Sequence, residues 1–493
     1  MFENPEKYKT LTFFGCCYLA FFTFNILTTW WIKNASYGGA AMAILCNALL
    51  MSIVFLLFHQ VKKRIGKKWG NSILICFWIS FEFIHLQWDI SWPWLTLGNT
   101  FADTPNWIQW YEYTGMFGGS LWVLLMNVSI FGLISNFKFQ ITNYKIIKLG
   151  LLLVLPFIAS FLCGLRYVNI TAPKKQFKVV IVQPNIDPYN EKFTVTYQEQ
   201  LQKMLELGAQ KTDSTTDYLI FPETALTEDV WENEIAQSRS INRIKQFLKN
   251  YPQLKIIIGA STAKVYQKDE QKSATARKFS DQEDYYDAYN TALQLDSTSH
   301  IQIYHKSKLV PGVEKMPFPF ILKYLGQFAI DLGGTTGSLG MQDERTVFSS
   351  PDNIMKAAPV ICYESIYGEY VGDYLKNGAN FIALITNDGW WGDTPGYKQH
   401  LKIGALRAIE TRSWIARSAN TGISCFINPL GEIQQATDYW VPAVISGNIE
   451  LNNEFTFYTR YGDYIARGAL YASILLIIYS LLVRFRVLRP QND

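Results

Sequence analysis

The sequence has few charged residues for its length, and the two signs nearly balance. Of its 493 residues, 17% are Asp, Glu, Lys or Arg, against about 25% in ordinary soluble domains. The formal net charge is only +4, and the basic residues fall in short loops. A nucleic-acid-binding protein would gather its cations into one strong patch. Nucleic acid is therefore not an expected partner.

Cysteine is also scarce, with seven residues in the chain. Five of them lie inside apolar stretches, where they are interpreted as ordinary small residues: Cys16, Cys17, Cys46, Cys76 and Cys163. Only Cys362 and Cys425 fall in the polar middle of the chain. These two could form a disulfide bond, but neither is flanked by the residues typical of a disulfide-closed loop. No disulfide framework is therefore expected. Cys425 has no nearby acid or base and is interpreted as structural, which leaves the Cys362 thiol to explain.

Apolar residues are abundant, and they gather at the two ends of the chain. They make up 49% of the sequence, and several runs approach the roughly 20 residues that a helix needs to cross a bilayer. Six membrane-spanning helices are predicted, over about residues 11–31, 39–58, 72–90, 115–135, 149–165 and 469–483. The predicted organisation is a transmembrane bundle over residues 1–165, a large middle domain over 166–467, and a C-terminal transmembrane helix with a basic tail over 468–493.

Lysines and arginines orient these predicted helices. Basic residues cluster at 62–68, at 138–148 and in the tail at 484–489, whereas the opposite loops carry a single lysine. Cytoplasmic loops are enriched in Lys and Arg. Six crossings then place both termini in the cytoplasm and residues 166–467 outside it.

Two polar residues, Glu82 and His85, interrupt the third predicted span. Placing an ionisable group inside the bilayer costs free energy, so such residues are first interpreted as functional. Residues three apart share one helix face, so the two side chains could equally well pair with each other. Both readings stay open on the sequence.

From about residue 177 the pattern changes to short β-branched runs alternating with polar helical stretches. Such alternation predicts a layered α/β domain. The strands are expected over 178–183, 218–223, 255–260, 289–295, 301–305, 380–386 and 422–427, with a further strand that ends at Cys362 in the stretch 359–365. The helices are expected over 196–207, 238–250 and 400–412. Residues 268–287 are expected to form an exposed loop. The apolar stretch 318–328 is predicted either to dip into the membrane surface or to form a lid packed on the domain.

Three residues with reactive side chains, Glu223, Lys306 and Cys362, stand at or just after predicted strand ends. A carboxylate can take a thiol proton, and an ammonium favours the thiolate and later faces an oxyanion. Taken singly, each has an ordinary explanation: a buried cysteine packs as a small hydrophobe, a Glu after Pro often begins a helix, and Lys306 is one of two loop lysines. The flanking residues decide between these readings.

The flanks resemble the nitrilase (carbon–nitrogen hydrolase) superfamily, which has a Glu-Lys-Cys triad on an αββα sandwich. The matching segments are FPETA at 221–225, YHKSKLVP at 304–311 and VICYE at 360–364. Fusion of this domain to transmembrane spans narrows the resemblance to its membrane-bound members, the apolipoprotein N-acyltransferase family. The expected fold is therefore a polytopic α-helical membrane domain plus a nitrilase-like αββα outer domain.

The resemblance also implies roles. Glu223, Lys306 and Cys362 would be catalytic, and Glu314, Tyr363 and Glu364 would support them. The implied reaction moves an acyl chain from a phospholipid, through a thioester on the cysteine, to the N-terminal amine of a diacylglyceryl-cysteine lipoprotein. It implies no metal and no cofactor. The implied location is the bacterial inner membrane, with the catalytic domain on the periplasmic side.

The sequence departs from that family in two places. Six spans are predicted where the family usually has eight, and an early tryptophan of the family is unmatched, with Lys192 or Phe193 near its position. Two other functions use the same features: a membrane-tethered amidase or nitrilase-type hydrolase, and a catalytically silent lipoprotein-binding scaffold. The intact triad argues against the scaffold, and the six spans argue against a hydrolase of small soluble amides.

Overall fold

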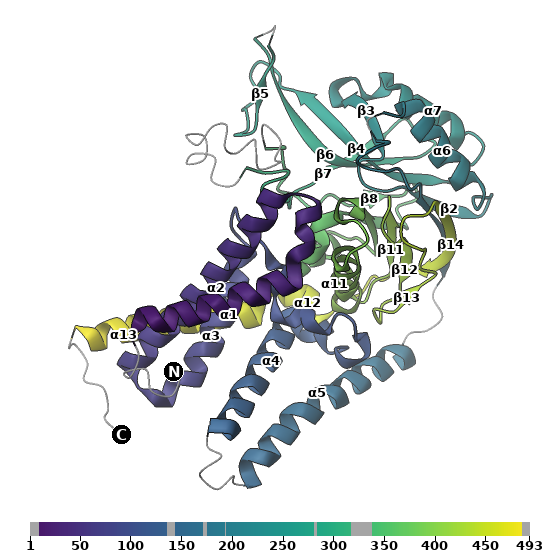
Figure 1. Ribbon diagram of the computed structural model, residues 1–493. Coiled ribbons are helices and arrows are strands. Elements are labelled where there is room, and N and C mark those ends of the chain that lie inside the picture. The colour runs from purple at the N-terminus through teal and green to yellow at the C-terminus, as the bar shows by residue number, and fades with distance from the viewer. Residues whose placement is uncertain are drawn as a thin grey trace. The chain divides into compact units, whose positions relative to one another are not determined.

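The computed structural model describes residues 9–135, 143–170, 175–192, 194–280, 283–316 and 338–485. The chain divides into two compact units, the first made of residues 1–166 with 461–493 and the second of residues 167–460 (Figure 1). The predicted membrane-surface stretch 318–328 and Phe193 lie outside the described residues.

The first unit is a helical membrane domain. Its helices are α1 (Thr10–Thr29), α2 (Tyr37–Ile65), α3 (Gly70–His85), α4 (Tyr111–Ser135), most of α5 (Asn143–Ile170) and α13 (Tyr464–Arg484). In Figure 1, α1, α2, α3 and α13 lie side by side. Within the described residues, five helices are long and apolar enough to cross a membrane, namely all of these except α3. Apolar side chains such as Phe161 and Leu475 stay exposed, as they would on a helix face that meets lipid.

The predicted third span is wrong in its extent. It was expected over about 72–90, but α3 ends at His85 after 16 residues. Such a helix is about 24 Å long, shorter than the roughly 30 Å hydrocarbon core of a bilayer. The chain then continues through short 3₁₀ helices, the first at Pro93–Leu95, where proline occupies the first helical position, which needs no backbone N–H donor. The last span was also placed too late, since α13 begins at Tyr464.

Glu82 and His85 do not pair with each other. The Glu82 carboxylate accepts hydrogen bonds from the indole of Trp78 at 3.0 Å and the backbone N–H of Leu97 at 2.7 Å. His85 Nδ1 accepts from the indole of Trp88 at 2.8 Å. Among the described residues, the remaining atoms Glu82 Oε2 and His85 Nε2 have no hydrogen-bond partner. The two side chains instead fasten the end of α3 to the segment that follows it.

The second unit contains two β-sheets. The first sheet has the order β14-β1-β2-β4-β6-β5, with β3 beside β4 and β7 beside β6; the second has the order β13-β12-β11-β10-β9-β8. The strands of the first sheet are β1 (Gln176–Gln183), β2 (Thr216–Ile220), β3 (Leu226–Trp231), β4 (Lys255–Val265), β5 (Arg277–Lys278), β6 (Tyr285–Leu295), β7 (Ile301–His305) and β14 (Ala443–Glu450). Those of the second are β8 (Phe348–Ser349), β9 (Lys356–Ile361), β10 (Phe381–Thr386), β11 (Ile415–Ala419), β12 (Cys425–Ile427) and β13 (Ile433–Gln434).

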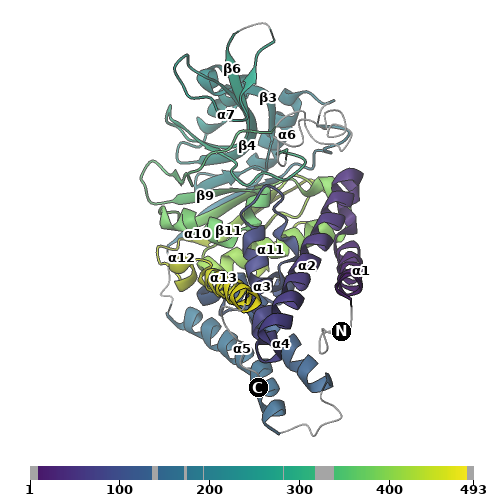
Figure 2. The ribbon, with the colours of Figure 1, turned by 90° about the vertical axis from the view of Figure 1, so that its left-hand side faces the viewer.

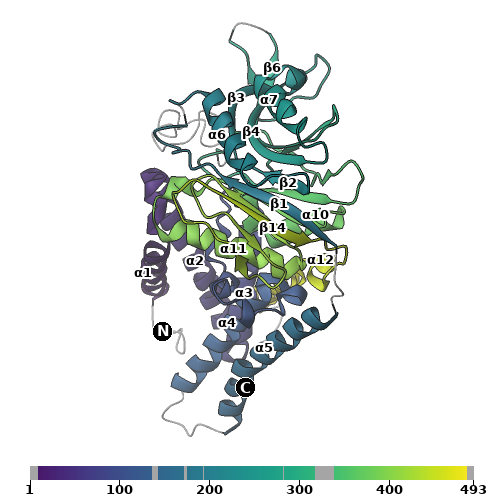
Figure 3. The ribbon, with the colours of Figure 1, turned by 90° about the vertical axis from the view of Figure 1, so that its right-hand side faces the viewer.

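The sheets pack face to face and helices cover their outer faces, which is the predicted αββα sandwich. The Ser418 hydroxyl on β11 donates to the Val182 carbonyl on β1 at 2.8 Å, and the Tyr218 and Phe381 rings meet edge to face across the same interface. Helices α6 (Tyr197–Ala209) and α7 (Arg239–Leu248) lie over the first sheet (Figure 2). Helices α10 (Gly368–Lys376) and α11 (Pro395–Thr411) cover the second (Figure 3).

Burial explains why these elements form where they do. Four consecutive residues of β1, Val179–Val182, are fully buried, as in a strand covered on both faces. Helix α6 begins at a capping box in which Thr196 and Glu199 bond each other's backbone N–H, a strong start signal. The predicted exposed loop over 268–287 is wrong at its end. Its last residues form β5 and the start of β6, because Phe279 packs on Trp231 and Tyr286.

Candidate active site

Cys362 stands directly after β9, where the chain turns sharply into a short 3₁₀ helix at Cys362–Ile366. Its backbone φ is +49°, a conformation that non-glycine residues rarely adopt and that is strained for them. Strand β9 lies parallel to β10 in the middle of the second sheet. The strand and the turn together place the partly buried Cys362 at the end of β9.

Lys306 follows β7 directly and is held between two carboxylates. Its Nζ lies 3.0 Å from Glu223 Oε1 and 2.9 Å from Glu314 Oε1, and the ammonium is buried. The Asn290 amide donates to the same two oxygens, at 2.8 and 2.9 Å. Burial opposes the charged form of Lys306, but the two carboxylates outweigh it and raise the pKa of the ammonium well above its usual value.

Glu223 is reached through the Phe-Pro segment after β2, not within the strand as predicted. Its second oxygen accepts the backbone N–H of Asn387 at 3.0 Å. The segment passes close to β4 at Gly259, where an added Cβ would lie 2.6 Å from the Cα of Glu223. Only glycine fits at that approach. The carboxylate is therefore held from the first sheet by packing and from the second by a hydrogen bond.

The three predicted catalytic residues are thus brought together, from separate parts of the chain. Burial, and next the negative charge of Glu223, raise the pKa of the Cys362 thiol well above its usual value, while Lys306 acts in the opposite direction. The resting group is therefore a protonated thiol. Its use as a nucleophile requires a base, and Glu223 is the predicted one.

The supporting residues occupy different places. Glu314 contacts Lys306 directly and also accepts the Val310 N–H at 2.8 Å. Glu364 is fully buried and ties the cysteine turn to the lysine loop: it accepts the N–H groups of Ile361 and Ser307, each at 2.8 Å. The hydroxyls of Tyr304 and Tyr370 also donate to Glu364, each at 2.6 Å. Tyr363 is buried with its ring against Tyr367.

A second polar group lies beside Cys362, and it was not singled out as a site from the sequence. Ligand-type atoms of Cys362, Asp388 and His400 lie within 4.8 Å of one another, a set of donors that can hold a metal. Both Asp388 oxygens are already used, however: Oδ1 by Thr386 and His400, and Oδ2 by Arg417. We interpret the group as an internal hydrogen-bond network.

Lys192 adds another cation near the carboxylate. Its Nζ donates to the Thr224 hydroxyl at 2.5 Å, next to Glu223 in the chain. Burial lowers the pKa of Lys192, and the charge of Glu223 partly offsets this. The position near which the resemblance expects a tryptophan thus supplies a half-buried amine.

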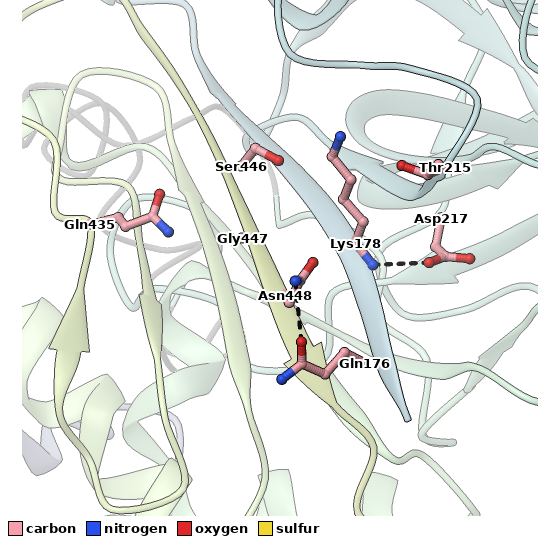
Figure 4. Close-up of a pocket in the computed structure, with 8 residues that line it drawn as sticks. All are labelled: Gln176, Lys178, Thr215, Asp217, Gln435, Ser446, Gly447 and Asn448. Atoms are coloured by element: carbon pink, nitrogen blue, oxygen red, sulfur yellow. Dashed lines mark hydrogen bonds between the residues drawn. The ribbon is translucent and has the colours of Figure 1, made fainter. Parts of the chain in front are cut away.

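A polar depression elsewhere in the second unit belongs to the edge of the first sheet. It measures about 660 Å³ and is lined by Gln176, Lys178, Thr215, Asp217, Gln435, Ser446, Gly447 and Asn448. Figure 4 shows the Lys178 N–H bonded to Asp217, and the Asn448 amide bonded to Gln176. None of the three predicted catalytic residues lines this depression, so it is separate from the candidate active site.

A thiol, a carboxylate and an ammonium at the strand ends of an αββα sandwich define a class of cysteine-dependent enzymes. Residues 178–454, more than half of the chain, match the family model for Carbon-nitrogen hydrolase. The chain therefore belongs to the carbon–nitrogen hydrolase family, and the resemblance of its motifs to that superfamily is confirmed. Residues 3–129 match a second family model, Apolipoprotein N-acyltransferase N-terminal domain.

Relatives of similar length are named apolipoprotein N-acyltransferase. The chain is 29% identical over 490 residues to the apolipoprotein N-acyltransferase of Chlorobaculum tepidum, covering 97% of this chain and 89% of that protein. It is 27% identical over 442 residues to the apolipoprotein N-acyltransferase of Geobacter metallireducens, covering 88% and 78%. Among solved structures, the chain is similar to Saccharomyces cerevisiae Nit3 of the nitrilase superfamily, with a TM-score of 0.40, 13% identity and coverage of 59% and 96%.

Proposed function

We propose that this protein is an apolipoprotein N-acyltransferase, which moves an acyl chain from a phospholipid to the N-terminal amine of a diacylglyceryl-cysteine lipoprotein. One observation carries the proposal: a single chain combines a Glu-Lys-Cys site with a bundle of membrane-length apolar helices. A cysteine nucleophile forms covalent acyl intermediates. A membrane anchor keeps the enzyme where both lipid-bearing substrates reside.

In the first half-reaction, Glu223 takes the proton of the Cys362 thiol and the sulfur attacks an ester carbonyl of the phospholipid. Lys306 and backbone N–H groups near Cys362 stabilise the oxyanion of the tetrahedral intermediate. The intermediate then breaks its carbon–oxygen bond, and Glu223 returns the proton to the departing lysophospholipid. The acyl chain remains on Cys362 as a thioester. The raised pKa of the thiol supports this order, because a protonated thiol needs the base first.

In the second half-reaction, the lipoprotein amine attacks the thioester carbonyl. Glu223 takes a proton from the attacking nitrogen, Lys306 again faces the oxyanion, and the carbon–sulfur bond breaks. The proton passes from Glu223 to the sulfur, which restores the thiol. The same base and the same cation thus serve both steps.

A transfer assay tests this function. Purified enzyme is mixed with phospholipid and a diacylated lipopeptide that has a free N-terminal amine, and products are read by mass. The expected product is a lipopeptide heavier by one acyl group, together with one lysophospholipid per transfer. The same lipopeptide with its amine acetylated is the control and should gain nothing. Free fatty acid as the only acyl product would show a hydrolase, and no product at all would show a scaffold; either result contradicts the proposal.

We further infer that the catalytic unit lies on the periplasmic side of the bacterial inner membrane. The basic residues before α3, such as Lys62, and those in the first turns of α5, Lys145 and Lys148, should share the cytoplasmic side. Only a crossing by α3 places both groups there. The charges therefore support a sixth crossing despite the short length of α3.

Reporter fusions test this topology. A phosphatase that is active only outside the cytoplasm is fused after Arg64, after Ser135 or after Lys175. We expect activity only in the third fusion. Helix α3 takes the chain out of the cytoplasm, α4 brings it back before Ser135, and α5 takes it out again before Lys175. An active fusion after Ser135 would show that α3 does not cross. An inactive fusion after Lys175 would place the catalytic unit in the cytoplasm.

A further inference from the structure

His400 lies on α11 beneath the cysteine turn and is almost completely buried. Its Nδ1 is 2.9 Å from Asp388 Oδ1. Its Nε2 is 3.1 Å from the Ser365 hydroxyl and 3.2 Å from the backbone carbonyl oxygen of Cys362. The edge of the Trp391 ring system closes the remaining side, with ring centroids 5.6 Å apart. The imidazole therefore joins a buried carboxylate to the backbone of the candidate nucleophile.

The partners of Nδ1 require a proton on that nitrogen. Asp388 pairs with Arg417 at 2.5 Å and accepts the Thr386 hydroxyl at 2.9 Å. Burial opposes the charge of Asp388, but Arg417 and His400 outweigh it and hold the pKa of the carboxyl well below its usual value. An ionised carboxylate has only acceptor positions. His400 Nδ1 must therefore donate.

The partners of Nε2 favour a proton there as well. The Ser365 hydroxyl donates its single hydrogen to the Cys362 carbonyl at 2.7 Å, so its oxygen presents lone pairs to His400. The Cys362 carbonyl is itself an acceptor. A bare Nε2 would meet two sets of lone pairs at hydrogen-bond distance. With the Ser365 hydrogen directed at the Cys362 carbonyl, its shorter contact, this geometry favours a hydrogen on both ring nitrogens.

We propose that His400 is a positioning residue: a buried imidazolium, held by Asp388 and Arg417, whose Nε2–H fixes the backbone carbonyl of Cys362. The carbonyl of Cys362 and the N–H of Tyr363 belong to one planar peptide and point in opposite directions. Holding the carbonyl therefore fixes the N–H direction on the other side. It also supports the left-handed backbone of Cys362, which would otherwise relax.

Rates of acylation test this role, which rests on Cys362 being the acylated residue of the proposed function. We expect His400→Ala to slow acylation of Cys362 by phospholipid about 100-fold, because a small misplacement of a reacting atom has effects of this size. His400→Gln, which keeps one N–H donor, should recover about tenfold of that loss. The phospholipid concentration giving half-maximal rate should change less than twofold. Tyr397→Phe removes one hydroxyl from the same helix and is the matched control.

The outcomes separate the two proposals. Failure of the wild-type enzyme to form an acyl adduct would overturn the proposed function. If the wild-type enzyme forms the adduct and folded His400→Ala and His400→Gln are acylated at the wild-type rate, the positioning role alone is overturned. A shift in the half-maximal concentration with an unchanged maximal rate would also overturn it, because that pattern belongs to substrate binding.

A measurement on the unmodified protein does not depend on how the variants fold. Protein labelled with nitrogen-15 in its five histidines and with carbon-13 at the cysteine carbonyls is studied by solid-state NMR at pH 7.5. The histidine Nε2 that lies closest to a labelled carbonyl should belong to a ring with both nitrogens protonated. A neutral ring at that position would overturn the inference.

Discussion

Replacing Cys362 with alanine should abolish acyl transfer, with a loss of about 10⁴-fold or more. In the proposed mechanism, the thiol holds the acyl chain between the two substrates. Removing it leaves Glu223 and Lys306 in place but gives the ester nothing to react with. Transfer by the assay with phospholipid and a free-amine lipopeptide measures the loss.

Cys425 provides a matched control for that variant. It is the other cysteine of the second unit and is fully buried on β12, and burial raises the pKa of its thiol to about 12. A thiol in that environment is inert. Cys425→Ala should therefore keep the wild-type rate per folded molecule. Full activity in Cys362→Ala, or an equal loss in Cys425→Ala, would rule out Cys362 as the acyl carrier.

Replacing Glu223 with glutamine should slow both half-reactions by roughly 10³-fold, the size of a general acid–base contribution. Glutamine has nearly the same shape, so the chain near Gly259 is not disturbed. It cannot take the thiol proton, and the raised pKa of Cys362 means that little thiolate forms without the base. Single-turnover acylation and discharge of the thioester measure the two steps separately.

Glu314→Gln separates the role of a base from that of a charge. Both carboxylates contact the Lys306 ammonium, at 3.0 and 2.9 Å, and both accept from Asn290. Each substitution therefore removes one carboxylate charge from beside the Lys306 ammonium, but only Glu223 is expected to transfer protons. Glu314→Gln should be at least ten times more active than Glu223→Gln. Equal losses would mean that Glu223 acts only through the lysine.

The sequence led to Glu223, Lys306 and Cys362 as predicted catalytic residues through the resemblance of their flanking residues, because each residue taken alone has an ordinary explanation. Lys306 follows β7 of the first sheet and Cys362 follows β9 of the second, so their proximity depends on how the two sheets pack. Asn290 could not be found this way, since it lies inside β6 and its role depends on which strand pairs beside it. The same holds for His400, whose inferred protonation depends on partners in two other elements, the turns at Cys362–Ile366 and Asp388–Trp391.

The errors in the predicted fold have similar causes. The third span was drawn too long because the residues after His85 remain apolar and aromatic, and hydropathy does not register the turn before Pro93. The start of β6 was missed because its aromatic residues are stabilised by Trp231 from another strand. Local pattern predicts an element well when its own residues form the core, and poorly when distant partners do.

The measurement that tests the mechanism most directly is the mass of the peptide that contains Cys362. Purified enzyme is incubated with phospholipid alone, digested and analysed, and a second sample then receives the diacylated lipopeptide. We expect one acyl group on Cys362 in the first sample, and its loss in the second with the same acyl group now on the lipopeptide amine. No adduct on the wild-type cysteine, or an adduct that only water removes, would contradict acyl transfer through this thiol.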